Sequence, residues 1–186
     1  AGILGIAVGF AAKDTLSNLF AGIFIIADAP FRVGDYILLD TGERGEVVHI
    51  GLRSTRILTR DDVEVSIPNG ILGNTKIVNE TGGPAPRQRV RVQVGVSYDS
   101  DLDQVREVLM KVAEAVDLVL DTPEPRVRFR SFGDSSLAFE LLVWVAEPSL
   151  RGMALDALNT AVHRAFSEAG VQIPFPQRDL RILERS

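Results

Sequence analysis

Few side chains in this sequence have the types and the spacing that catalysis requires. The chain has 186 residues and no cysteine, which excludes a cysteine nucleophile, a disulfide framework and a cysteine-based zinc site. Its two histidines, His49 and His163, lie far apart and belong to neither an HxH nor an HExxH pattern. The sequence also lacks a GxSxG motif and a phosphate-binding loop. It therefore predicts no enzyme, no metal site and no cofactor.

Two adjacent charges, Lys13 and Asp14, stand in a long stretch of apolar and small residues. A soluble core rarely buries two neighbouring charges, and the centre of a membrane span excludes them. The pair fits a junction at which one helix stops, the chain bends and a second helix starts at a new angle. Asp14 or Thr15 would then cap the start of the second helix. We therefore predict a helix bend at Lys13 and Asp14, where the charges meet water.

The segment before this pair, residues 1–12, is too short to cross a bilayer alone. As a helix it would be about 18 Å long, whereas a membrane span needs about 20 residues. We expect the second half of a span that begins upstream, rather than a signal peptide, which would have a basic start. Gly5 and Gly9 have the spacing that lets membrane helices approach closely, and Ile6 and Phe10 project from a neighbouring stripe. A glycine-tolerant core helix is the alternative.

After the bend, apolar residues follow the period of an amphipathic helix that Pro30 should end. Its apolar stripe consists of Leu16, Leu19, Phe20, Ile23, Ile26 and Ala27. From residue 30 to 81 the pattern changes to short alternating runs separated by glycine and aspartate, which predicts a small β-barrel or sandwich. The expected strands are 36–39, 46–50, 54–59, 63–67 and 75–78. Pro68-Asn69-Gly70 is interpreted as a turn, and residues 82–88 as a linker.

Residues 89–186 predict an α/β domain with the order βαββαβ, which is the ferredoxin-like split βαβ arrangement. The expected elements are a strand at 90–96, a helix at 101–116 capped by Ser100 or Asp101, strands at 126–132 and 137–146, a helix at 151–169 and a last strand at 179–183. Helices should cover one face of this sheet and leave the other open.

The open face of that sheet should carry Glu140, Leu142 and Trp144 together with a set of arginines. Successive side chains of a strand point to opposite faces of the sheet, and the arginines that fall on the open face by this alternation are Arg89, Arg91, Arg126, Arg128 and Arg130. Three uses are open for such a face: a solvated surface, a subunit interface or an RNA platform. Paired aromatic residues for stacking bases are missing, and the net charge of −5 repels polyanions. We therefore expect no nucleic-acid partner.

Four segments resemble the MscS family of small-conductance mechanosensitive channels, in the right order along nearly the whole chain. They are AVGFAAKDTLSNLFAGIFIIADAPFRVGDYI, IPNGIL, GVSYDSDLDQV and IPFPQRDLRI. The resemblance implies the end of a pore-lining helix and an interfacial helix over residues 1–29. It further implies an Sm-like β domain over 30–81, a linker over 82–88 and a ferredoxin-like domain over 89–186.

The resemblance also implies a role for each matching residue. Ile6 and Phe10 match the two leucines of the family's hydrophobic pore gate. Gly5, Ala7 and Gly9 match small residues that pack neighbouring pore helices together, although Ile3 replaces one expected alanine. At the bend, Lys13-Asp14 replaces the family's Gln-Gly, so a break built in by capping is expected in place of a glycine hinge.

The function implied is a tension-gated, weakly selective ion channel that releases ions and small solutes on hypo-osmotic shock. The expected assembly is a homoheptamer in the cell membrane, a bacterial inner membrane, with residues after about 30 in the cytoplasm forming a vestibule. Its partners would be other copies of the chain, membrane lipid and permeating ions, with no cofactor. The alternatives are a soluble oligomeric scaffold that binds RNA or a small ligand, and a ligand-gated member of the same family.

Overall fold

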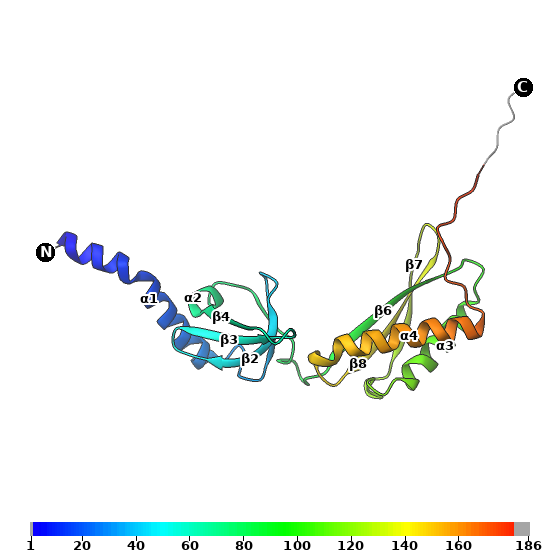
Figure 1. The fold of residues 1–186 in the computed structure, drawn as a ribbon, viewed down its shortest axis with the longest axis horizontal. Helices are drawn as coiled ribbons and strands as arrows, with labels where there is room; N and C mark the ends of the chain where they lie inside the picture. The colour runs from blue at the N-terminus through cyan, green and yellow to red at the C-terminus, as the bar shows by residue number, and fades with distance from the viewer. Residues whose placement is uncertain (1, 181–186) are drawn as a thin grey trace, which may run out of the picture. The chain divides into compact units, whose positions relative to one another are not determined.

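The computed structural model describes residues 2–180, without the side chains of Ile3 and Leu4. It divides into two compact units, residues 1–86 and 87–186 (Figure 1). The buried apolar residues form two clusters, one over residues 25–72 and one over residues 90–171. Because neither cluster contains a residue of the other unit, each unit is stabilised by its own core.

The first unit begins with α1 (Gly2–Asp28), a helix of 27 residues. The helix is long and apolar enough to cross a membrane by length and composition, and only 11% of its most apolar window is buried. It ends where the Ala29 backbone N–H donates to the Ile25 carbonyl, with Ala29 at φ 45° just before Pro30. Ile25 is its contribution to the core of this unit.

Five antiparallel strands follow α1 in the sheet order β4-β3-β2-β1-β5. The elements are β1 (Tyr36–Leu39), β2 (Arg44–Ile50), β3 (Ser54–Thr59), β4 (Glu64–Pro68), α2 (Asn69–Leu72) and β5 (Ile77–Asn79). Their inward residues, among them Ile37, Val47 and Ile57, have no exposed surface. The turn predicted at Pro68-Asn69-Gly70 is wrong, because Asn69 starts the short helix α2. The Asn69 side chain bonds inward, to Thr55 and to the Gly51 carbonyl, and so fixes this segment.

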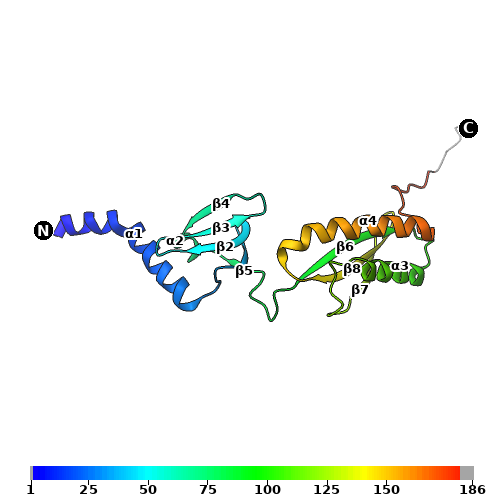
Figure 2. The same cartoon turned by 60° about the horizontal axis from the view of Figure 1, so that its bottom comes forward.

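The second unit places α3 and α4 against a three-stranded antiparallel sheet (Figures 1 and 2). Its elements are β6 (Gln88–Val96), α3 (Leu102–Ala115), β7 (Arg126–Phe132), β8 (Leu137–Val145), the short 3-10 helix η1 (Pro148–Leu150) and α4 (Arg151–Ala169). Asp101 caps α3 by accepting from the backbone N–H groups of Asp103 and Gln104. Gly170 ends α4 at φ 69°, in the left-handed region that glycine adopts without strain.

The sheet order β6-β8-β7 is the one that a ferredoxin-like domain requires for its first three strands. The expected fold class is confirmed: an apolar N-terminal helix, a small β domain of the Sm-like type and an α/β domain. The strand predicted at 179–183 is not found over Asp179 and Leu180, which have no regular structure. The remainder of that predicted strand lies outside the described residues.

Candidate functional site

The N-terminal half of α1 presents apolar side chains that nothing among residues 2–180 covers. Ile6 is 63% exposed and Phe10 is 75% exposed, and their four-residue spacing places them on one stripe of the helix. Val8, on another side of the same turns, is equally exposed. A soluble core helix buries such residues, whereas Ile6 and Phe10 are exposed in this structure.

The small residues beside that stripe are equally free of neighbours. A side-chain carbon added at Gly5 or Gly9 would meet no atom within 4 Å, and Ala7 is exposed. Among the residues that the structure describes, therefore, nothing requires glycine at these two positions. Glycine inside a helix costs up to about 1 kcal/mol relative to alanine, so these two glycines lower the helix propensity of α1.

The structure differs from the expectation of a capped break at Lys13 and Asp14. Helical backbone continues through both residues, and neither Asp14 nor Thr15 caps a new helix. The Asp14 carbonyl instead accepts a hydrogen bond from the Asn18 side-chain amide at 2.8 Å. Such bonds to a carbonyl one turn earlier bend helices without breaking them. Both views show α1 changing direction along its length (Figures 1 and 2).

The C-terminal half of α1 is held against the β domain by an unusually close approach. A side-chain carbon at Gly22 would lie 2.2 Å from the Leu52 carbonyl oxygen and 2.6 Å from the Asn69 amide nitrogen. Asn18 makes the second link, because its side-chain oxygen accepts from the backbone N–H of Gly70 at 2.8 Å. These contacts join α1 to α2, and sequence reasoning missed them. The local signal for them is the pair Asn69-Gly70, for which the sequence predicts a turn.

A polar cluster fixes the chain where α1 ends and the β domain begins. The Asp35 carboxylate accepts from the Asn79 amide at 2.8 Å and from the Thr81 hydroxyl at 3.2 Å. The backbone N–H of Arg32 donates to the same carboxylate at 2.8 Å. Burial would raise the pKa of Asp35, but the hydrogen bonds from Asn79 and the Arg32 backbone hold that pKa below its ordinary value. The cluster therefore keeps Asp35 ionised and locks the loop to β5.

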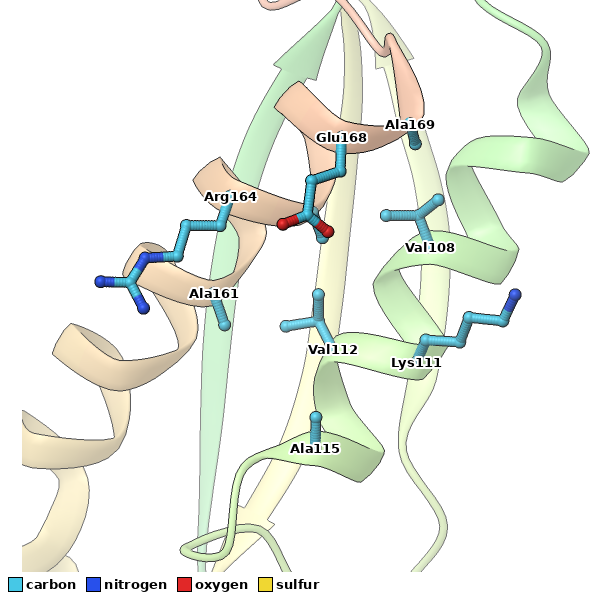
Figure 3. Close-up of a pocket in the computed structure, with 9 residues that line it drawn as sticks. Val108, Lys111, Val112, Ala115, Ala161, Arg164, Glu168 and Ala169 are labelled. Atoms are coloured by element: carbon cyan, nitrogen blue, oxygen red, sulfur yellow. The ribbon is translucent and has the colours of Figure 1, made fainter.

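A groove of about 550 Å³ lies between α3 and α4 on the helical side of the second unit. Figure 3 shows Val112 and Ala161 on facing sides of it, with Lys111 and Arg164 extending to opposite sides. Lys111 pairs with Glu107 on its own helix at 2.6 Å. Over residues 2–180, no three His, Asp or Glu side chains gather closely enough to hold a metal ion. The groove has the small apolar lining of a helix pair and no arrangement for catalysis.

The arginine face predicted for the second unit is present on the side of the sheet opposite α3 and α4. In the strand register, Arg89 lies opposite Trp144, and Leu142 lies between Arg91 and Arg126. One detail differs from an open, wet face: Glu140 and Leu142 are buried, at 3% and 8% exposed. The long arginine side chains flank both residues while their charged ends stay in solvent.

Two family models match the chain. The model for the β-domain of mechanosensitive ion channels matches residues 14–82, and the model for the C-terminal part of the mechanosensitive ion channel MscS matches residues 90–173. A small-conductance mechanosensitive channel of Edwardsiella ictaluri is 32% identical over 97% of this chain. An uncharacterized MscS family protein of Synechocystis is 34% identical over 96% of it. The chain spans 62% and 59% of the length of these two relatives.

Among solved structures, the closed state of Helicobacter pylori MscS is similar to this chain. The two superpose with a TM-score of 0.87 at 28% sequence identity, and the match covers 99% of this chain and 72% of the other. An Arabidopsis thaliana structure, MSL1, shares the fold at 24% identity with a TM-score of 0.67.

Proposed function

Because the chain belongs to the MscS family of mechanosensitive ion channels, we propose that it forms the pore end and the cytosolic body of a channel opened by membrane tension. The channel is weakly selective and releases ions and small solutes on hypo-osmotic shock. The observation that carries the proposal is the exposed apolar stripe of Ile6 and Phe10, on the half of α1 that lies away from the core of the first unit. Such a stripe suits a ring of identical helices around a pore.

Ile6 and Phe10 are the gate of this channel. A ring of apolar side chains that is narrow enough expels water and so blocks ions without a plug. Phenylalanine is bulkier than the leucine expected from the family, so the ring at Phe10 closes tightly. Gly5, Ala7 and Gly9 pack against the adjacent pore helix, which explains glycine at two positions where a side chain would meet no atom of residues 2–180.

The full assembly is a homo-oligomer, expected to be a heptamer, in the cell membrane. Residues after about 30 lie in the cytoplasm, where the β and α/β domains of all copies enclose a vestibule. Lys13 and Asp14 ring the cytosolic end of the pore, where the helix bends. Membrane tension favours the state that occupies more area in the bilayer, and that bias opens the pore without a cofactor.

Membrane lipid is the further partner of this assembly. An apolar groove of about 550 Å³ lies between α1 and the β domain, and its lining includes Phe20, Phe24, Ile25 and Leu72. Phe20 and Phe24 are more than half exposed on this helix. Acyl chains match the chemistry of this groove, and their displacement under tension would couple the bilayer to α1.

The test is patch-clamp recording of the full-length protein in a lipid bilayer under stepped suction. We expect Phe10→Ser to open at lower tension than wild type, because a hydroxyl at the gate lowers the cost of wetting the pore. Val8→Ser is the matched control: it removes a similarly exposed apolar side chain from another side of the same helix and should leave the threshold unchanged. Normal openings that Phe10→Ser does not alter would place the gate elsewhere. Silence of folded, inserted wild type would overturn tension gating.

A further inference from the structure

The sheet face opposite α3 and α4 carries a concentration of positive charge in a chain whose net charge is −5. Its arginines, all exposed, are Arg89, Arg91, Arg126, Arg128 and Arg130. On one strand, alternate residues lie about 7 Å apart, so neighbouring guanidinium groups have room to converge on one ligand. Two acidic residues lie near these arginines: Glu140 is buried beneath them, and Glu124 is exposed at the edge of the site they form.

A concave site of about 350 Å³ lies among these side chains. It is lined by Arg89, Arg126, Arg128, Arg130, Leu142 and Trp144, with Glu124 and Pro123 also at its wall. Small-molecule sites in proteins begin at about 300 Å³, so the space suits a small ligand rather than a polymer.

The arginines of this site differ in what they bind within the chain. Arg130 donates to Glu140 from its Nε at 2.7 Å, and Arg91 lies 4.0 Å from the same carboxylate. Burial would raise the pKa of Glu140, but these two guanidinium groups hold that pKa below its ordinary value. The negative charge of Glu140 is therefore paired mainly with Arg130. The guanidinium carbons of Arg89 and Arg87 lie 5.7 Å and 5.3 Å from the centroid of the Trp144 ring, within the range of a cation–π contact.

Arg126 and Arg128 remain without such a partner. In the part of the chain that the structure describes, no acidic group lies within 4.0 Å of either guanidinium. Two like charges held on one strand repel each other, and an anion between them removes that repulsion. Each arginine offers only donors, in a planar fork that matches the paired oxygens of a phosphate group.

We propose that this arginine pocket binds a small, multiply charged phosphate compound through the forks of Arg126 and Arg128. A phosphate group presents only acceptor oxygens to donors that have no acceptors of their own, and it carries up to two charges. The proposal goes beyond the proposed channel function and does not depend on it. Its test is a binding measurement that needs no ion current, so either idea can fail alone.

Trp144 supplies the readout because it is the single tryptophan of the 186-residue chain and forms part of the site. The full chain in detergent is titrated with sodium pyrophosphate at constant ionic strength while Trp144 fluorescence is recorded. We expect a saturable change that sodium chloride at matched ionic strength does not produce. Removing two charge-assisted contacts with Arg126→Gln/Arg128→Gln should raise the Kd at least about tenfold.

The control variant is Arg151→Gln/Arg164→Gln, which removes the same charge from α4, on the other side of the sheet. Its Kd should equal that of wild type. Arg128→Lys keeps the charge but removes the fork, and it should also weaken binding, which covers the case in which the double variant does not fold.

Three results would overturn the proposal. They are no saturable change with wild type, an equal Kd in the Arg126→Gln/Arg128→Gln variant, and an equal response to chloride. Two further titrations identify the source of the phosphate. Vesicles of phosphatidylcholine with phosphatidic acid test a lipid headgroup, and oligouridylate tests RNA. A response to either of these without a response to pyrophosphate would also overturn the proposal.

Discussion

Glycine at position 22 sets how closely α1 can approach the β domain. The space that a side chain would need is filled by the Leu52 carbonyl, in the turn between β2 and β3, and by the Asn69 amide, which donates to the Gly51 carbonyl in the same turn. The backbone of Gly22 is helical, so its conformation does not require glycine. The close contact with the β domain does. The glycines near the N-terminus of α1 have no such contact within the chain.

We expect Gly22→Ala to destabilise the first unit by about 1–3 kcal/mol, because the added carbon would have to push a backbone carbonyl aside. Gly2→Ala is the control, since a side chain there meets nothing within 4 Å. Urea unfolding of the chain in detergent measures both. Equal midpoints for Gly22→Ala and wild type would show that α1 does not pack at this distance.

Glu140 makes stability depend on pH. Its pKa is lowered in the folded state, so the folded protein binds fewer protons in acid than the unfolded chain does. Its contribution is present above the unfolded pKa of about 4.3 and is lost as the pH falls through the folded pKa. Glu140→Gln lacks this contribution at every pH, so we expect it to be about 1 kcal/mol less stable than wild type at pH 7. The difference is no larger because the Arg130 guanidinium is partly exposed and water screens its charge.

The measurement is the free energy of unfolding of wild type and Glu140→Gln in urea, from pH 7 to pH 3. The difference between the two proteins should shrink toward the acid end. Parallel curves over that range would mean that the carboxylate is not stabilised by its arginines in the folded state.

At the scale of elements, α1 and α2 act as a pair because one side chain bonds both. Asn18 donates to a carbonyl of its own helix and accepts from the backbone N–H of Gly70. The same residue thus curves α1 and anchors it to α2, which is itself fixed to the sheet through Asn69. In the proposed channel, this contact would transmit motion of the membrane helix to the β domain.

Asn18→Ala should expose the Gly70 amide and raise its hydrogen-exchange rate several-fold, which corresponds to the loss of about 1 kcal/mol. Ser17→Ala is the neighbouring control, because Ser17 lies near Gly70 without a hydrogen bond to it. Hydrogen-exchange mass spectrometry of the segment containing α2 reads both variants. An unchanged exchange rate in Asn18→Ala would show that the hydrogen bond between Gly70 and Asn18 does not hold α1 to α2.

At the scale of the whole molecule, the chain consists of two units with separate cores. The first has the membrane-length helix and the β domain, whereas the second has the arginine face and the helix pair. Since no buried residue is shared, damage to one core should stay in that unit.

Leu158→Ala in α4 tests this independence. Leu158 has no exposed surface, so its truncation should cost the second unit about 2–5 kcal/mol. Exchange protection should fall in β6, β8 and α4 and remain unchanged in β2 and β3. Ile57→Ala, in the core of the first unit, should give the reverse pattern. Loss of protection in both units from either substitution would show a single cooperative domain.

The sequence alone determined most of the helices and strands, because each depends on neighbours a few residues away, but it predicted neither α2 nor one continuous α1. The alternation of Val90, Val92 and Val96 fixed the buried face of β6, and Asp101 and Gly170 marked the ends of helices. The same alternation placed the arginines together on the opposite face. The apolar and small residues of α1, together with the family segments, identified the channel family.

Only the tertiary structure decided which of these elements touch and at what distance. The bond from Gly70 to Asn18 spans 52 positions, and the crowding at Gly22 comes from Leu52 and Asn69, so no local pattern contains either contact. For the same reason the sequence predicts a turn at Asn69, whose side chain bonds residues 14 and 18 positions away. The burial of Glu140 under arginines of two other strands also follows from strand register, which pairs residues that are remote in sequence.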